Sequence, residues 1–170
     1  MTPEFLRASI DREIGKAERL LNLSLPTDWP DDPSILSLRL EQLESNPALQ
    51  PWLLRAMRLR DTGEMVGHIG FHTAPGAPYL QDWAPAGVEF GFTVFSAYRR
   101  RGYAREASLA LMQWACEVHG ITEFLITVGR ENMASTALAA ALGFGKVGSH
   151  IDEVDGVEDV FIRSCADAGR

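Results

Sequence analysis

The sequence predicts an α/β protein in which a mixed, mostly antiparallel sheet carries helices on both faces. The first reason is the order of the expected elements: two helices precede three strands, a helix, a strand, a helix and two strands. The second reason is the segment 88–119, where strand-forming residues lead through a short basic loop into a long helical pattern. The 170 residues suffice for one substantial core, and we expect a single domain over residues 1–170.

The N-terminal part is expected to be helical. Thr2 can cap a helix, Pro3 suits its first position, and apolar residues recur through residues 2–22. Three prolines within residues 25–33 interrupt this pattern, and a second helix is expected at about residues 34–44.

A hairpin is expected next. Residues 52–60 and 64–71 are apolar runs separated by the turn residues Asp61-Thr62-Gly63. The following segment, residues 72–87, is rich in proline, glycine and alanine and shows no periodicity. Long loops in compact domains are often functional, so we expect this one to contribute to a substrate site. The alternative is a disordered surface excursion.

The remaining chain alternates strands and helices. Strands are expected at residues 88–95, 123–128, 146–152 and 157–163, and helices at 102–119 and 131–142. Asp155-Gly156, within residues 153–156, predicts a turn between the last two strands.

The junction after residues 88–95 has the features of an anion site. The first N–H groups of a helix lack partners within the helix, and the helix dipole is positive at that end. Gly102 has no Cβ and lets a ligand approach the backbone closely. Arginines add donors suited to phosphate oxygens, at positions 99, 100, 101 and 105. The alternative is a solvated basic loop without a ligand.

Composition narrows the class of protein. The net charge of −7 disfavours nucleic acid as the main partner and permits a cationic substrate. We expect no membrane span and no signal peptide, hence a cytoplasmic protein. Cys116 and Cys165 are expected to be free thiols. The four histidines (His68, His72, His119, His150) show no ligand spacing, so we expect structural roles and no metal.

Two motifs together resemble those of the GNAT superfamily of N-acetyltransferases, over roughly residues 51–163. The first is Val94-x-x-x-Tyr98-Arg99-x-Arg101-Gly102-x-Ala104, whose Arg99, Gly102 and Ala104 match the acetyl-CoA signature Gln/Arg-x-x-Gly-x-Gly/Ala. The second is Asn132-x-x-Ser135-x-x-Leu138-x-x-x-Leu142-Gly143-Phe144. Their order and spacing resemble the branch that contains the ribosomal-protein alanine acetyltransferases.

The resemblance implies a GNAT fold whose central strands splay apart around acetyl-CoA, the co-substrate. It implies that pantetheine pairs with the strand edge and that the basic loop holds the pyrophosphate. The implied cofactor-binding residues are Phe92, Thr93, Val94, Arg99, Arg100, Arg101, Gly102, Tyr103, Ala104, Arg105, Asn132 and Ser135. Asn132 could instead serve only as a helix cap. The family's usual first strand has no counterpart before the first helix here, so it is either missing or replaced.

Glu89 is the candidate general base, because a carboxylate beside the splayed segment could accept the proton of an ammonium. Glu64, Asp82 and a water chain are alternatives. The family's tyrosine that protonates the leaving thiolate is replaced by Ala139, and Ser135 or a water is expected to assist instead.

The resulting hypothesis is an acetyl-CoA-dependent N-acetyltransferase that acts by direct attack in a ternary complex. The acceptor would be a primary amine of a small molecule or of a peptide N-terminus. Homodimers are common in the family. A non-catalytic acyl-CoA-binding sensor is the alternative. A generic nucleotide-diphosphate binder is disfavoured because the sequence contains neither a GxxxxGK[ST] loop nor a GxGxxG fingerprint.

Overall fold

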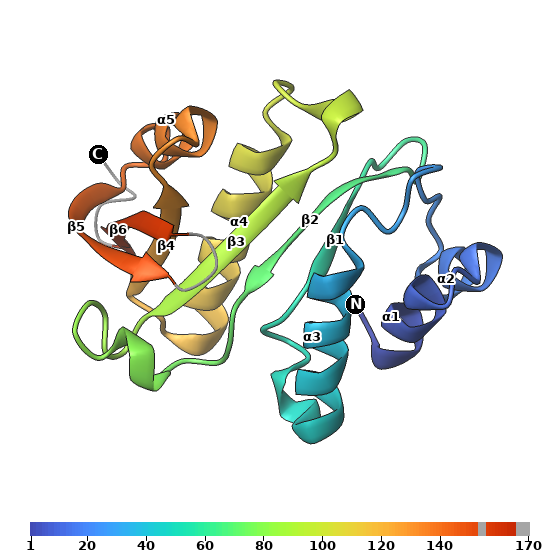
Figure 1. The fold of residues 1–170 in the computed structure, drawn as a ribbon, viewed down its shortest axis with the longest axis horizontal. Coiled ribbons are helices and arrows are strands. Elements are labelled where there is room, and N and C mark those ends of the chain that lie inside the picture. Colours follow the sequence, from blue (N-terminus) through green and yellow to red (C-terminus); the bar gives the residue numbers. More distant parts are fainter. Residues whose placement is uncertain (153–155, 166–170) are drawn as a thin grey trace. The chain divides into compact units, whose positions relative to one another are not determined.

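The computed structural model describes residues 1–152 and 156–165 (Figure 1). The chain forms two compact units. Unit 1 comprises Met1–Gly70 and Phe92–Tyr103, and unit 2 comprises Phe71–Gly91 and Ala104–Arg170. No helix in the described part of the chain is both long enough and apolar enough to cross a bilayer.

Unit 1 begins with three helices, α1 (Pro3–Ile10), α2 (Ile14–Leu21) and α3 (Pro33–Ser45). The expectation of one helix over residues 2–22 is wrong, because Arg12 adopts a left-handed conformation (φ 57°) and breaks it. Thr2 does cap α1, since its hydroxyl accepts a hydrogen bond from the Phe5 N–H. The helix expected near residues 34–44 is confirmed by α3.

The hairpin is confirmed, with strands β1 (Arg55–Arg58) and β2 (Met65–Phe71). Its turn needs a glycine, because Gly63 has a φ of 76°. The Phe95 N–H donates to the Val66 carbonyl, so the chain after β3 also runs beside β2. The core of unit 1 is built around the fully buried side chains of Phe5, Leu6, Trp29, Leu36 and Leu43.

The sheet has the strand order β1-β2-β3-β4-β6-β5. Its further elements are β3 (Val88–Val94), α4 (Tyr103–His119), β4 (Glu123–Gly129), α5 (Met133–Ala141), β5 (Gly145–Asp152) and β6 (Gly156–Ser164). The β3–β4 pair is parallel, whereas the β1–β2, β4–β6 and β5–β6 pairs are antiparallel. The mixed, mostly antiparallel sheet is therefore confirmed. Among the described residues, no strand precedes α1, and Ser24 forms only an isolated bridge with Glu64. The turn expected at residues 153–156 lies largely outside the described residues.

The pairing of β3 with β4 is short. It joins Val88 to Phe124 and Glu89 to Leu125, and it stops there although both strands continue.

Strand register assigns the side chains of unit 2 to two faces, because paired residues share a face and successive residues alternate. One face contains Phe90 and Phe124, which contact Phe71, and Phe71 also stacks on Trp114 of α4. The opposite face, here called the Glu89 face, contains Glu89, Leu125, Thr127, Val160, Ile162, Gly148 and His150.

The loop over residues 72–87 packs on the Glu89 face. It contains a short 3₁₀ helix, η2 (Pro78–Leu80), and Leu80 is only 1% exposed. Ala77 and Leu80 join Leu125 and Val160 in one apolar cluster, with Trp83 beside it. The alternative of a disordered surface excursion is therefore wrong.

The expectation of two free thiols is also wrong. Cys116, on α4, forms a disulfide with Cys165, which follows β6. The two residues are 49 positions apart in sequence, so spacing alone did not suggest that the fold brings them together.

Candidate active site

Glu89 lies at the centre of a polar cluster on the Glu89 face. It is 5% exposed, because it stands on the central strand β3 beneath the loop of residues 72–87. The Thr127 hydroxyl on β4 donates to its Oε1 at 2.7 Å. The Nδ1 of His72 lies 3.3 Å from its Oε2. A buried carboxylate is thus satisfied by partners on both sides.

These partners determine the charge of Glu89. Burial is the largest single effect and would raise the pKa of the carboxyl group. Hydrogen bonds and charge from His72, with hydrogen bonds from Thr127 and Tyr79, outweigh burial and hold the pKa of Glu89 below its usual value. Glu89 is therefore a carboxylate at neutral pH, and a weaker base than an ordinary glutamate.

His72 is the member of this cluster that reaches the surface. Its side chain is 37% exposed, whereas that of Glu89 is 6% exposed. Its backbone N–H donates to the Glu89 carbonyl, which fixes the register of the two residues. A Cβ on Gly91 would lie 2.9 Å from the His72 Nε2, so a glycine at this position makes room for the imidazole. The expectation of a purely structural histidine overlooked this contact, and the sequence signal for it, Glu89-x-Gly91, is weak.

The alternative carboxylates have different surroundings. Glu64, in unit 1, accepts a hydrogen bond of 3.0 Å from the Tyr98 hydroxyl. Asp82 is exposed on the loop of residues 72–87. In the described part of the chain, neither forms an ion pair with an imidazole as Glu89 does.

The expected anion site has a distinct backbone geometry. Between the 3₁₀ helix η3 (Ser96–Tyr98) and the start of α4, both Arg100 (φ 62°) and Gly102 (φ 85°) are left-handed. A Cβ built on Gly102 would meet no described atom within 4 Å. The backbone immediately before the N-terminus of α4 is therefore open on that side, as close approach of a phosphate requires.

The arginines of this loop have different surroundings. The Arg99 Nε donates to the Val94 carbonyl at 3.0 Å and so holds the loop to the end of β3. The Arg101 guanidinium lies 5.7 Å from the Tyr98 ring centroid, over the ring face. Arg100 and Arg105 are exposed, while Tyr103 and Ala104 are half-buried in the first turn of α4.

The strand residues expected to meet pantetheine are less buried than those before them. Val88, Glu89 and Phe90 are buried, whereas Phe92, Thr93 and Val94 are only half-buried. This half-buried end of β3 is followed by Phe95, the helix η3 and then the basic loop.

Asn132 caps α5 in the structure. Its side-chain oxygen accepts a hydrogen bond from the Ser135 N–H at 3.1 Å. Asn132 and Ser135 are thereby brought together in the first turn of the helix. Ala139, which stands where many family members have tyrosine, is fully buried.

Comparison with known proteins identifies the family. The profile of the acetyltransferase (GNAT) domain matches residues 12–145, which is most of the chain. The chain belongs to the GNAT acetyltransferase family.

Individual GNAT relatives are distant in sequence. The uncharacterized N-acetyltransferase YjdG of Bacillus subtilis is 28% identical over 85 residues, which cover 50% of this chain and 46% of the relative. The ribosomal-protein-S5-alanine acetyltransferase of Vibrio fischeri has a similar fold, with a TM-score of 0.66, 14% identity, and coverage of 98% of this chain and 91% of that chain. The microcin C7 self-immunity acetyltransferase MccE, solved with acetyl-CoA and AMP, has a TM-score of 0.59 and 16% identity, with coverage of 95% and 86%.

Proposed function

We propose that the protein transfers an acetyl group from acetyl-CoA to a primary amine of a small molecule or of a peptide N-terminus. Family membership supports acetyl transfer. The observation that carries the proposal further is the His72–Glu89 pair, in which a buried carboxylate holds a partly exposed imidazole.

Acetyl transfer of this kind needs a proton acceptor. The amine nitrogen attacks the thioester carbon, a C–N bond forms, and the C–S bond breaks to release the CoA thiolate. The attacking amine must be neutral, so its ammonium proton has to be removed first. A positioned base typically contributes about 10²–10⁴-fold to the rate of such a step.

We assign this role to His72, and Glu89 positions it. The lowered pKa of Glu89 makes its carboxylate a poor direct base, and its burial keeps it from an incoming amine. Ionised Glu89 does orient the imidazole by accepting a hydrogen bond at Nδ1, and it stabilises the imidazolium that forms. The carboxylate first expected to act directly therefore acts through its neighbour.

The basic loop is assigned to the pyrophosphate of acetyl-CoA. The open backbone at Gly102, the N-terminus of α4 and the surrounding arginines together fit a phosphate. The family resemblance assigns the half-buried residues Phe92, Thr93 and Val94 to the pantetheine arm, and it assigns the same role to Asn132. Ser135 is retained as a group that assists departure of the thiolate.

The proposal is tested by thiol release from acetyl-CoA across a panel of amines, including diamines, amino acids and peptides. The wild-type chain is expected to release CoA with at least one class of acceptor. His72→Ala is expected to lose about 10²–10⁴-fold in kcat/KM, while its affinity for acetyl-CoA is unchanged. His119→Gln is the matched control, since His119 lies on α4 against Trp114.

Added imidazole distinguishes the two roles. It is expected to restore part of the activity of His72→Ala, because it can fill the space left by the side chain, and none of that of Glu89→Gln. Equal activity of wild type and His72→Ala would overturn the assignment. Tight acetyl-CoA binding without turnover on any amine would instead support the acyl-CoA sensor.

A further inference from the structure

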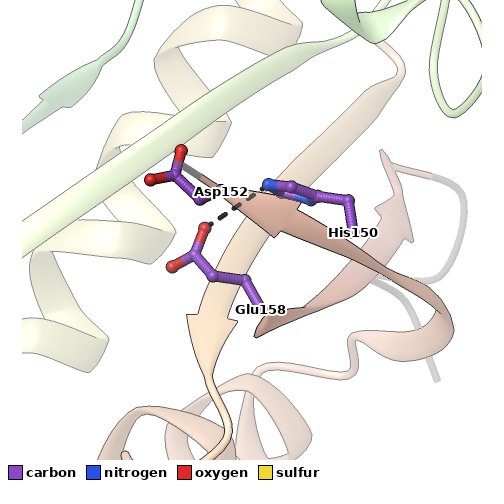
Figure 2. A group of neighbouring side chains, drawn as sticks. All are labelled: His150, Asp152 and Glu158. Atoms are coloured by element: carbon purple, nitrogen blue, oxygen red, sulfur yellow. Dashed lines mark ion pairs between the residues drawn. The ribbon is translucent and has the colours of Figure 1, made fainter. Parts of the chain in front are cut away.

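Three potential metal ligands lie together on the β5–β6 hairpin (Figure 2). His150 pairs directly with Glu158 across the two strands, and Asp152 follows His150 by two positions on β5. Paired residues and residues two apart share a face of a sheet, so all three side chains project to the same side. All three are half-buried.

The ligand atoms are close enough to share one ion. The His150 Nε2 lies 3.6 Å from the Glu158 Oε2. One atom from each of His150, Asp152 and Glu158 can be chosen so that all lie within 4.8 Å of one another. Metal–ligand bonds of about 2.0–2.2 Å place neighbouring ligand atoms roughly 3–3.6 Å apart around a tetrahedral ion. His150 and Glu158 already have this spacing, and side-chain rotation has to bring the third ligand atom in from within 4.8 Å.

We propose that His150, Asp152 and Glu158 bind a divalent transition-metal ion, with Zn²⁺ as the best match. One imidazole and two carboxylates are common Zn²⁺ ligands, and three protein ligands leave a position for water or another donor. The imidazole favours a transition metal over Mg²⁺ and Ca²⁺, which prefer oxygen ligands. The charge of two carboxylates offsets that of the ion.

The site is separate from the His72–Glu89 pair but lies on the same sheet face. On β4, Leu125 pairs with Glu89 of β3, and Thr127 and Gly129, two and four positions further on, pair with Val160 and Glu158 of β6. Residues that pair or stand two apart share a face, so Glu89 and Glu158 lie on the same face of the sheet. The large side chain of Trp83 packs against Gly148, which stands two positions before His150 on β5. The hairpin strands are paired from Gly145↔Ile162 to Asp152↔Gly156, which fixes the spacing of the ligands.

A simple His150–Glu158 ion pair is the competing explanation, and it requires no ion. The two explanations differ in what Asp152 does. The His150–Glu158 ion pair itself does not involve Asp152, whereas in a metal site Asp152 supplies the third ligand. Removing Asp152 therefore tests the proposal most directly.

The experiment titrates Zn²⁺ into the full chain, stripped with a chelator and kept oxidised so that Cys116 and Cys165 remain a disulfide. Calorimetry is expected to show one saturable site per chain, and the melting temperature is expected to rise with Zn²⁺. His150→Ala, Asp152→Asn and Glu158→Gln should each lower the affinity at least about 10-fold, a loss that even second-shell changes produce. His119→Gln is the control and should bind as wild type does.

The proposal is overturned if wild type shows no saturable binding, or if the variant carrying all three substitutions binds Zn²⁺ as tightly as wild type. Unchanged affinity in Asp152→Asn alone would also overturn it, because the trio would then be a pair. Circular dichroism of each variant without metal separates lost binding from lost folding.

Discussion

At the scale of single residues, Glu89 combines near-complete burial with a lowered pKa. Glu89→Gln keeps the shape of the side chain but removes the charge that orients His72. We expect kcat/KM to fall about 10²–10⁴-fold at neutral pH, with acetyl-CoA affinity unchanged. The acidic limb of the pH–rate profile should move toward the pKa of the acceptor amine, and higher pH should restore part of the rate. A variant with the wild-type rate and profile would remove this pair from catalysis.

A substitution at Gly102 tests whether the basic loop binds acetyl-CoA. Gly102→Val should weaken acetyl-CoA binding by at least about 10-fold, because its branched side chain fills the open space beside the backbone. The substitution also strains a positive φ, so a matched control is needed. Gly120 has φ 66° and equally open space, and Gly120→Val should destabilise the fold without affecting binding. Equal loss of affinity in both variants, measured by calorimetry, would mean that strain alone explains the effect.

The motif residues could be predicted from the sequence, whereas His72 could not. Arg99, Gly102 and Asn132 stand at fixed spacings, and a spacing is visible in a sequence. His72 reaches Glu89 only because its backbone N–H pairs with the Glu89 carbonyl and because position 91 lacks a side chain. Contacts of this kind depend on the assembled sheet, so no local sequence pattern predicts them.

At the scale of elements, Arg99 and Arg101 of the basic loop should differ in how their loss affects ligand binding. Arg101→Ala is expected to lose about 1.5–3 kcal/mol of acetyl-CoA binding through a lost phosphate contact. It should leave binding of acetyl-pantetheine, which lacks the phosphates, unchanged. Arg99→Ala should weaken both ligands, because Arg99 also holds the loop to Val94. Equal losses for both ligands in Arg101→Ala would show that this arginine is structural.

On the β5–β6 hairpin, the face opposite His150 and Glu158 holds a charged cluster around Asp159, whose pKa can be measured. Lys146, with Ser149 and Arg130, lowers the pKa of Asp159 to about 2. Because the folded pKa lies below the unfolded value of about 3.9, this pairing stabilises the protein at neutral pH and is lost as pH falls through about 2. Lys146→Met should raise the pKa of Asp159 in an NMR titration, and Arg130→Met should raise it less. An unchanged value in Lys146→Met would refute the pairing.

The order of the elements could also be predicted, but not every boundary. Periodicity predicted α3, α4, α5 and the strands to within a few residues. It failed between α1 and α2, because the apolar stripe continues through a break that one left-handed residue creates. It predicted a loop at residues 72–87 but not its packing, because the buried apolar residues of this loop do not recur at a regular period.

At the scale of the whole molecule, the Cys116–Cys165 disulfide joins α4 to the end of the last strand. A crosslink that closes a loop of this length typically contributes about 2–4 kcal/mol to the free energy of unfolding. Adding a reductant should therefore lower the denaturation midpoint, and Cys116→Ser should lower it similarly and make the protein insensitive to reductant. Identical midpoints with and without reductant would show that the bond is not formed in solution.

The packing of the loop of residues 72–87 also restricts how this chain can diverge. Most loops accept insertions and deletions because little of the core depends on them. Here Leu80 and Ala84 are buried, and Ala77 and Leu80 cover Leu125 and Val160, so a change in loop length would expose apolar surface. Homologues that differ in the amine they accept should therefore keep the length of this loop. They should vary at exposed positions such as Gln81 and Asp82 instead.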